Sequence, residues 1–277
     1  MSNVSSAPEA PGMAAVSAVW QRHTLGQKLA RTGFWLLVAA AVAASLEGID
    51  VIWEFLWDAP EQMADMVWRM WPPDLAYYPQ EVHRALMETF HIATVGTLFS
   101  MVFALPLAVL AAHNLTPNKA LNLFAKTCLV ASRSVNSLVW ALLFVAVFGP
   151  GPMAGTVAIA FRSVGFVGKL LGEALEEVHF GTIEALKAAG ATQTSQILYG
   201  YWPAVKPAFW SIMLLRWDIN IRESSVLGLV GAGGLGMIMN AAIDTFQWER
   251  VATILLTIFA VVVIVEVVVT FFRRQLI

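Results

Sequence analysis

The sequence predicts an all-α membrane protein with about six transmembrane helices, and two observations lead to this prediction. Hydrophobic residues make up 58% of the 277 residues and charged residues only 13%, whereas soluble domains contain about 25% charged residues. The second observation is a series of apolar runs, most of them close to the length of about 20 residues with which a helix spans a bilayer. These runs are 33–57, 91–113, 135–149, 151–171, 207–230 and 251–272.

The N-terminal residues are expected to form a tail followed by the first transmembrane helix. Residues 1–31 begin with a Ser-, Ala- and Pro-rich stretch, a composition that is typical of a disordered tail. The region 32–86 then holds the first apolar run, which we expect to continue as one uncleaved helix to Trp57, and an outer segment.

The outer segment, 58–79, is expected to be an amphipathic helix. Its Met and Trp side chains recur at helical spacing opposite Asp65 and Arg69. Aromatic and amphipathic segments favour the membrane–water interface. We therefore expect this segment to lie in the outer interface and to anchor the chain.

Residues 87–272 are expected to form the membrane core, and residues 273–277 a short tail. The sequence Gly149-Pro150-Gly151-Pro152 predicts a tight turn between the third and fourth spans, because Gly and Pro favour turns. A polar loop at about 173–206 separates the fourth span from the fifth.

This polar loop is expected to contain a short helix with one small face. Thr182 can cap the helix, Glu184 is favourable in its first turn, and Gly190 can end it with a left-handed residue. Thr192 can cap the following helix. The small face consists of Ala185, Ala188 and Ala189. Such a helix suits a groove on another protein, and a plain amphipathic connector is the alternative.

The fifth span carries charged residues that are costly in lipid. Each charge costs about 2.5–3.5 kcal/mol at mid-membrane, so we do not expect lipid exposure. At 100° per residue these side chains form two stripes. One stripe is Arg216, Asn220 and Glu223, and the other is Asp218, Arg222 and Ser225. Asp218 and Arg222 also stand in the i, i+4 order that favours an ion pair.

Two interpretations of these charges remain open. In the first, two acids neutralise two bases and lock helices together. In the second, the cationic groups line a water-filled path for an anion, and Arg162 of the fourth span adds a further positive charge. The candidate path residues are Arg162, Arg216, Asp218, Asn220, Arg222 and Ser225.

The distribution of Lys and Arg predicts a multi-pass protein of the cell (inner or plasma) membrane with both termini in the cytoplasm. Positive residues are retained on the cytoplasmic side. In this orientation the outer segments hold only Arg69, Arg84 and Arg250. The polar loop at 173–206 is then cytoplasmic.

Patterns that could indicate an enzyme do not hold. GAGGLG, at 231–236, matches a dinucleotide-binding turn, but it lies at the outer end of a predicted span. Its glycines Gly231, Gly233, Gly234 and Gly236 are instead expected to break the helix where the backbone bends or packs closely. SVGFVGKLLG resembles a phosphate loop, but it has Ser163 where Gly is required. The histidines lack metal-ligand spacing and no serine lies in G-x-S-x-G, so we expect no metal or catalytic site.

The loop resembles a motif of ABC importer permeases. EALKAAG, at 184–190, and Pro203 are similar to the E-A-A-x3-G-x9-I-x-L-P motif, whose helix binds in a cleft of the ATPase subunit. Leu186, Gly200 and Trp202 depart from it, standing where the motif has Ala, Ile and Leu.

The resemblance extends over roughly residues 60–275 to the permease subunit of phosphonate ABC importers. The similar segments are WPPDLAYYP, METFHIATVGTLFSMVFALPLAVLAAHN, GKLLGEALEEV and INIRESSVLGLVGAGGLGMIM. Methionine-type permeases end in a similar glycine-rich turn, so the resemblance defines the transport class better than the substrate.

This resemblance implies a type I ABC importer permease fold and a transport subunit rather than an enzyme. It implies import of phosphonate or a related phosphorus oxyanion, such as phosphate or phosphite, by alternating access. The partners it implies are a second copy of the chain, two ATPase subunits that bind ATP and magnesium, an extracytoplasmic binding protein and the lipid bilayer. No cofactor and no nucleic acid would bind to the chain itself. The residues coupling it to the ATPase would be Glu184, Ala185, Ala188, Ala189, Gly190 and Pro203.

Three alternatives stay open. The chain could be an ABC permease for another solute, such as methionine or a quaternary amine, although a cation path should offer aromatic boxes and a methionine path an apolar pocket. It could be a membrane-embedded enzyme that handles lipid, which would need a catalytic cluster. A passive channel is the third alternative, and it would not explain the loop.

Overall fold

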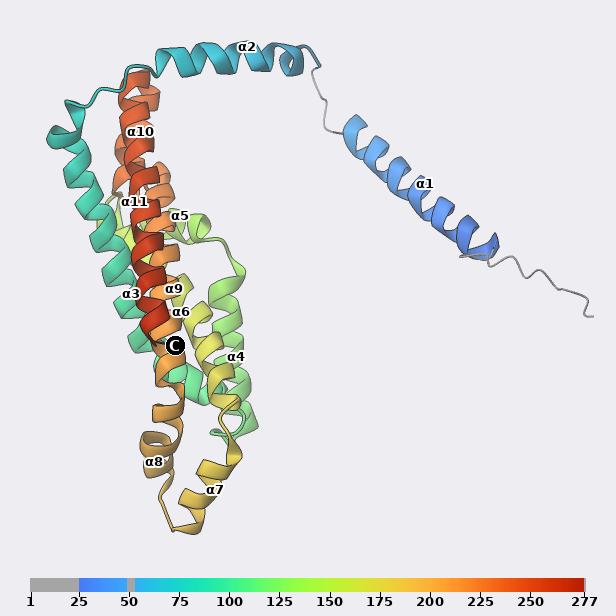
Figure 1. Ribbon diagram of the computed structural model, residues 1–277, viewed down its shortest axis with the longest axis vertical. Coiled ribbons are helices and arrows are strands. Elements are labelled where there is room, and N and C mark those ends of the chain that lie inside the picture. Colours follow the sequence, from blue (N-terminus) through green and yellow to red (C-terminus); the bar gives the residue numbers. More distant parts are fainter. Residues whose placement is uncertain (1–24, 49–52, 277) are drawn as a thin grey trace, which may run out of the picture. The chain divides into compact units, whose positions relative to one another are not determined.

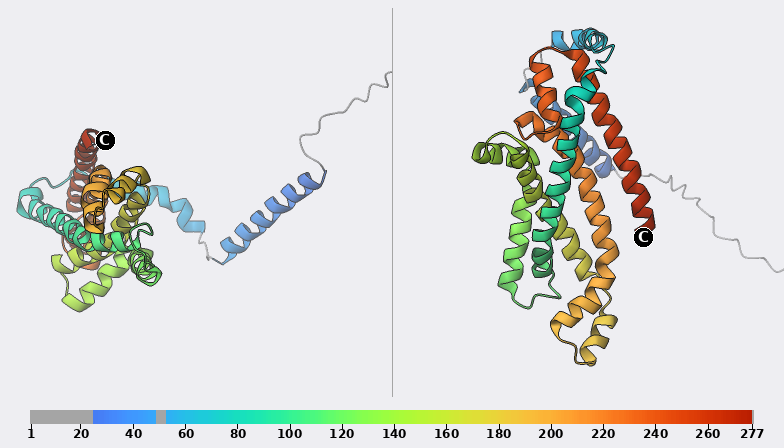
Figure 2. Two further views of the ribbon diagram at one scale, coloured as in Figure 1. Left: turned by 90° about the horizontal axis from the view of Figure 1, so that it is seen from below. Right: turned by 90° about the vertical axis from the view of Figure 1, so that its left-hand side faces the viewer.

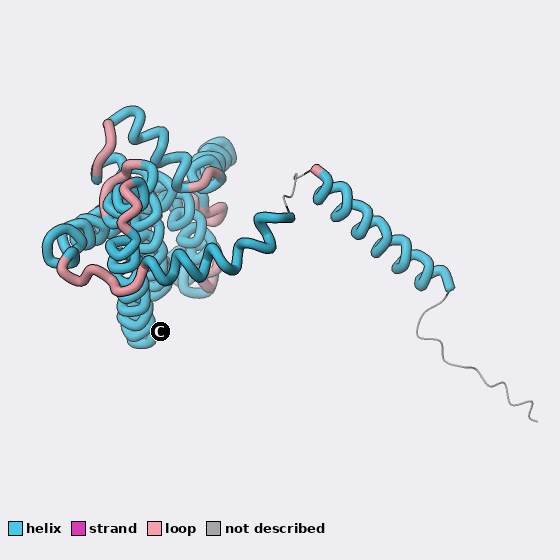
Figure 3. The backbone as a smooth tube through the Cα atoms, turned by 90° about the horizontal axis from the view of Figure 1, so that it is seen from above, coloured by secondary structure: helices cyan, strands magenta, loops and turns pink. Residues whose placement is uncertain are grey.

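A computed structural model describes residues 25–48 and 53–276, and within these ranges the chain forms helices joined by turns, with no strand (Figures 1 and 3). The long helices are α1 (Leu25–Glu47), α2 (Trp53–Arg69), α3 (His83–Ala111), α4 (Lys119–Ser134), α5 (Ser137–Phe148), α6 (Pro152–Glu176), α7 (Phe180–Ala188), α9 (Trp202–Leu227), α10 (Leu235–Asp244) and α11 (Trp248–Leu276). Single turns complete them: η1 (Tyr78–Val82), α8 (Gln193–Gln196), η2 (Ile197–Tyr201) and η3 (Gly228–Val230). The all-α prediction is confirmed.

Five helical stretches of the described chain are long and apolar enough to cross a membrane, or up to six if the bent pair α4–α5 counts as one span. The five are Gly26–Glu47, Tyr78–Ala111, Pro152–Glu176, Gln193–Asp244 and Trp248–Gln275. This agrees with the expected number of about six.

The predicted third span, 135–149, is wrong as a single crossing. Its helix, α5, has only 12 residues and is bent by 90° from α4, as the views in Figure 2 show. The bend occurs because Asn136 starts a new helix: its side chain accepts a hydrogen bond from the Leu138 N–H at 3.1 Å. Val135 before it has extended backbone angles.

The N-terminal part, to Gln62, is a unit separate from the part that begins at Met63. The predicted continuous helix to Trp57 is wrong, because α1 ends at Glu47, Gly48 follows as a turn, and Trp53 already belongs to α2. Residues 1–24, the larger part of the predicted tail, lie outside the described residues, and 25–31 are helical. Within this N-terminal unit the large apolar side chains of α1 are not buried.

The amphipathic helix expected over 58–79 is present but shorter. α2 runs over Trp53–Arg69, and its Asp65 and Arg69 form an ion pair of 2.7 Å. The helix ends before Trp71-Pro72-Pro73, where the two consecutive prolines disfavour helical angles at Trp71 and Pro72.

Helices α3, α6 and α9 form the centre of the second part and lie side by side in Figures 1 and 2. Small residues let α6 approach its neighbours closely, as in many membrane bundles. A Cβ added to Gly155 would clash with the carbonyl of Ala232, and one added to Gly165 would clash with the carbonyl of Leu129. On α3, a Cβ at Gly96 would lie 2.8 Å from a methyl carbon of Ile159.

The predicted turn between α5 and α6 is present. Gly149 and Gly151 have φ angles of 83° and 147°, which only glycine adopts readily. The Gly151 N–H donates to the Gly231 carbonyl at 2.8 Å, so this turn is joined to the glycine-rich turn after α9. At the other end of the chain α11 continues to Leu276, so 273–276 of the predicted tail are helical, and Ile277 lies outside the described residues.

We expect Gly165→Ala to destabilise the protein, because the new Cβ would meet the Leu129 carbonyl and lie 2.9 Å from the Ser132 hydroxyl. Overpacking of this kind costs about 1–3 kcal/mol. The measurement is the melting temperature of the purified protein in detergent. Gly33→Ala is the control, since nothing lies within 4 Å of its added Cβ. Equal melting temperatures for the two variants would contradict the role of Gly165.

Candidate functional site

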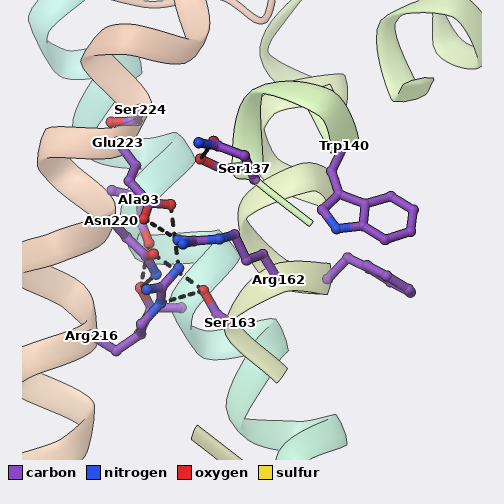
Figure 4. Close-up of polar contacts among 12 residues, drawn as sticks. Ala93, Ser137, Trp140, Arg162, Ser163, Arg216, Asn220, Glu223 and Ser224 are labelled. Carbon is purple, nitrogen blue, oxygen red and sulfur yellow. Dashed lines mark hydrogen bonds and ion pairs between the residues drawn. The ribbon is translucent and has the colours of Figure 1, made fainter. Parts of the chain in front are cut away.

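A buried chain of hydrogen bonds joins the three central helices (Figure 4). Arg216 of α9, only 2% exposed, donates from Nε to the Ser163 hydroxyl of α6 at 2.8 Å. Ser163 donates to Asn220 Oδ1 at 3.2 Å, and Asn220 Nδ2 donates to the Thr97 hydroxyl of α3 at 2.8 Å. Thr97 in turn donates to the Ala93 carbonyl at 2.6 Å. The network therefore fixes α9 against both α6 and α3.

Two arginines share one carboxylate in this network. Arg216 lies 3.3 Å from Glu223 Oε2, and Arg162 of α6 contacts the other oxygen, Oε1. Figure 4 shows both guanidinium groups directed at Glu223. Arginine is always charged, so this group of three side chains has one excess positive charge. The Arg162 Nε is buried and has no hydrogen-bond partner within the described part of the chain.

The structure divides the candidate path residues into two groups, along the two stripes that helical geometry predicts. Arg162 and Arg216 meet at Glu223, and Asn220 joins Arg216 through Ser163. Asp218 instead forms the predicted ion pair with Arg222, which also lies 3.6 Å from Glu266 of α11. Ser225 bonds only back to the Ile221 carbonyl of its own helix, at 3.2 Å, among the contacts described. The six residues do not form one site.

Two members of the network could not be identified from the sequence. Thr97 and Ser163 are small polar residues in apolar spans, and nothing in the local sequence distinguishes them from other such residues. Glu223 was visible, because it lies on the stripe of Arg216. We define the central cluster as Thr97, Arg162, Ser163, Arg216, Asn220 and Glu223.

The glycine-rich turn after α9 bends and packs closely. Gly231, Gly233 and Gly234 have φ angles of 84°, 85° and 71°, and a Cβ at Gly236 would clash with the Ser225 carbonyl. α3 holds the turn from the other side. Glu88 accepts from the Gly234 N–H at 2.8 Å, and Thr89 accepts from the Leu235 N–H at 2.9 Å.

The loop helix α7 lies with α8 at one end of the bundle (Figure 1). The predicted Thr182 cap is wrong: α7 begins at Phe180, and the residue before it, His179, makes no capping side-chain bond. Gly190 has a φ of 79°, and its N–H donates to the Lys187 carbonyl at 2.9 Å. Thr192 caps α8 by accepting from the Ser195 N–H at 3.3 Å.

The two faces of α7 differ in exposure. Ile183 is buried and Leu186 half-buried, and both pack toward η2. A Cβ added to Gly200 of η2 would lie 2.6 Å from Ile183 Cδ1 and 2.9 Å from Leu186 Cδ1. The residues of the predicted coupling set are all exposed: Glu184, Ala185, Ala188, Ala189, Gly190 and Pro203. The large side chain of Leu186 thus fits over the small Gly200. This pairing explains together why the chain has Leu186 where the ABC permease motif has Ala and Gly200 where the motif has Ile.

The apolar helices of this bundle bury charged groups among themselves, and the loop helix α7 leaves its small side chains exposed. These two features are typical of one class of protein, the multi-pass membrane transport subunits. Residues 104–277 match the family of binding-protein-dependent transport system inner membrane components. The chain belongs to this family and is the permease component of an ABC importer, a transport subunit rather than an enzyme.

Curated relatives agree with this family, and a solved transporter structure has a similar fold. The chain is 39% identical over 195 residues to the phosphite transport system permease protein PtxC of Stutzerimonas stutzeri, covering 70% of each chain. It is 33% identical over 246 residues to the phosphate-import permease protein PhnE of Mycolicibacterium smegmatis, covering 88% of this chain and 46% of that one. Its fold is similar to that of the MetNI methionine ABC transporter, with a TM-score of 0.61 at 22% identity over 71% of this chain and 96% of that one.

We expect Gly200→Val to loosen α7, because its side chain would occupy the space of Ile183 and Leu186. Leu186→Ala in the same chain should restore much of the packing. The measurement is the amide hydrogen exchange rate over 180–190 in the single and double variants. Contacting residues show coupling energies of about 0.5–3 kcal/mol, so strictly additive effects would contradict the pairing.

Proposed function

We propose that this permease imports a phosphorus oxyanion, namely phosphite, phosphonate or phosphate, by alternating access. The support comes from two sources. The relatives with 33–39% identity named above are phosphite and phosphate permeases. The central cluster has the charge that an oxyanion requires.

The observation that carries the proposal is the unbalanced charge at Glu223. Two buried or half-buried guanidinium groups meet one carboxylate, and the Arg162 Nε lacks a partner in the described residues. A buried donor without an acceptor is costly. An oxyanion can accept from Arg162 and neutralise the excess charge, and the planar fork of arginine matches the spacing of two phosphorus-bound oxygens.

The same carboxylate offers a way to change the packing of the helices. Glu223 of α9 holds both Arg162 of α6 and Arg216 of its own helix. An oxyanion that enters the cluster competes with Glu223 for these guanidinium groups. The contact between α6 and α9 then has two arrangements, one closed by Glu223 and one occupied by the anion, as a two-state transport element requires.

The loop helix α7 is the proposed contact with the ATPase subunit. Its exposed residues Glu184, Ala185, Ala188, Ala189 and Gly190, with Pro203, form the docking surface. Its opposite face packs on η2, which runs directly into α9. A displacement of α7 by an ATPase therefore reaches Arg216 through continuous helical structure, and the ATP and magnesium are held by the partner.

The proposed assembly follows from this arrangement. Two copies of the chain pair, two ATPase subunits bind at the α7 loops, and an extracytoplasmic binding protein delivers the oxyanion. The α7 loop and both termini then face the cytoplasm, in keeping with the bias of Lys and Arg. One loop of this kind per chain fits a homodimer.

We expect Arg162→Gln to reduce uptake of the phosphorus oxyanion at least tenfold at limiting substrate, because hydrogen bonds to charged groups contribute about 1.5–3 kcal/mol. Arg222→Gln is the matched control, since Arg222 lies on the other stripe of α9 and pairs with Asp218. Uptake is measured in proteoliposomes with the ATPase and binding protein, at equal amounts of assembled permease. Similar mild losses in both variants would favour a purely structural role for the cluster.

We expect Gly190→Val to weaken ATPase binding without affecting membrane insertion. Its φ of 79° is unfavourable for a β-branched residue, so the end of α7 would be displaced. Co-purification of the ATPase with the permease measures the effect, and Gly26→Val in α1, with open space around it, is the control. Full ATPase recovery with Gly190→Val would contradict the docking role of α7.

A further inference from the structure

A second group of charges lies along the seam between α4 and α6, outside the central cluster. On α6, Lys169, Glu173 and Glu176 follow Arg162 at intervals of seven, four and three residues, which places all four on one helical stripe. On α4, Lys126 and Arg133 are seven residues apart and also share a stripe.

All of these side chains except Arg162 line a common cavity of about 230 Å³, which we call the α4–α6 groove. Its lining residues are Ala111, Lys126, Leu129, Val130, Arg133, Lys169, Gly172, Glu173 and Glu176. A water molecule takes about 30 Å³ in the liquid, so the groove has room for a small hydrated anion.

The charges of the groove are not balanced. Lys169 lies 3.3 Å from Glu173, and Lys126 lies 3.9 Å from Glu176. Glu176 is bound more closely by His113, with 2.8 Å to its Nδ1 and 2.9 Å to its backbone N–H. Arg133 has no ion pair within the described part of the chain. The groove therefore has three cationic side chains against two carboxylates.

The groove begins beside the central cluster and leads toward the end of the bundle that carries α7. Arg133 follows Ser132, whose hydroxyl accepts from the Gly165 N–H of α6 at 3.1 Å, three residues from Arg162. At the other end, Asn114 donates to the Leu175 carbonyl at 2.8 Å, next to Glu176. Leu175 shares an apolar cluster with Ile183 of α7.

Charged side chains within membrane spans are too costly to face lipid, since each costs about 2.5–3.5 kcal/mol there. Lys169 belongs to the candidate span Pro152–Glu176, and it lies about 10 Å before the end of α6 at 1.5 Å per residue. The side chains of Lys126 and Lys169 are nonetheless 49% and 44% exposed. A water-filled groove accounts both for the presence of these charges within the span and for their exposure.

From these observations we infer that the α4–α6 groove is a second, transient binding site for a tetrahedral phosphorus oxyanion, on the α7 side of the central cluster. This rests on the proposed function, which it extends by a site with named residues. The Arg133 guanidinium and the Lys169 ammonium hold the anion. Glu173 and Glu176, farther along α6, repel it, and this keeps the site weak enough for the anion to leave, as conduction through successive sites requires.

The test uses a cysteine placed in the groove as a reporter of occupancy. Cys128 is the single cysteine of the chain, so Cys128→Ser provides a cysteine-free background. Val130→Cys then places a thiol on the groove lining, and Leu121→Cys, exposed on α4 but outside the lining, is the control. The full-length chain is studied in vesicles of zwitterionic lipid, with a water-soluble thiol reagent and with methylphosphonate or inorganic phosphate as the probe.

Methylphosphonate or phosphate should slow modification of Val130→Cys by roughly fivefold or more and leave Leu121→Cys unchanged. Arg133→Gln should raise the half-protecting concentration about tenfold, because a charge-assisted contact is lost. Lys119→Gln, an exposed cation on α4 outside the lining, should have no effect. Glu173→Gln should lower the half-protecting concentration, an improvement that a merely structural role for these charges would not produce.

The outcomes separate this site from its rivals. Failure of the water-soluble reagent to modify Val130→Cys, absence of protection, or equal effects of Arg133→Gln and Lys119→Gln would overturn the inference. Protection by phosphatidylglycerol in the vesicles, without protection by soluble phosphate, would overturn it in favour of a lipid headgroup. If the groove fails these tests but the protein still takes up phosphorus oxyanions, the proposed function stands. Protection by sulfate alone, together with no uptake of phosphorus oxyanions, would contradict the proposed function.

Discussion

The packing of the three central helices depends on how the buried charge of Arg216 is compensated. A guanidinium that is 2% exposed among membrane helices must have its donors satisfied and its charge compensated, because an unpaired buried charge is far more costly than any single packing contact. Ser163 and Glu223 meet this need, and Asn220 extends the network to Thr97. The same bonds that solvate Arg216 therefore hold α3, α6 and α9 together.

This way of compensating a charge leaves one of the two arginines incompletely paired. One glutamate serves two arginines, so the network is complete for Arg216 and incomplete for Arg162, whose Nε has no partner in the described chain. Small residues also let α3 and α6 approach closely, since a Cβ at Gly96 would lie 2.8 Å from a methyl carbon of Ile159. The contact of α7 with η2 links the exposed loop to the helix that carries Arg216. The polar centre and the packing contact of the loop helix thus lie on one continuous stretch of helix, η2–α9.

The fold was largely predictable because its main signals are local. Apolar runs indicated the spans, helical periodicity separated the Arg216 stripe from the Asp218 stripe, and Gly190 was expected to end a helix. The errors arose where a few residues begin or end a helix within a segment whose composition does not reveal the boundary. Asn136 starts a new helix and bends the third span, and the prolines after Trp71 stop α2 early. Thr182 has the right chemistry for a cap, but the chain enters the helix two residues before it.

By itself, the sequence determined that the chain crosses a membrane, which faces of its helices carry charge, and that a glycine-ended helix interrupts the spans. These properties follow from the 3.6-residue period and from the cost of polar groups in lipid, and both act within one segment. Only the tertiary structure decided that Arg162 shares Glu223 with Arg216, that Thr97 and Ser163 complete the network, and that Leu186 fits over Gly200. Such pairings join residues up to 123 positions apart, and they depend on how helices rotate and approach one another, which no local pattern specifies.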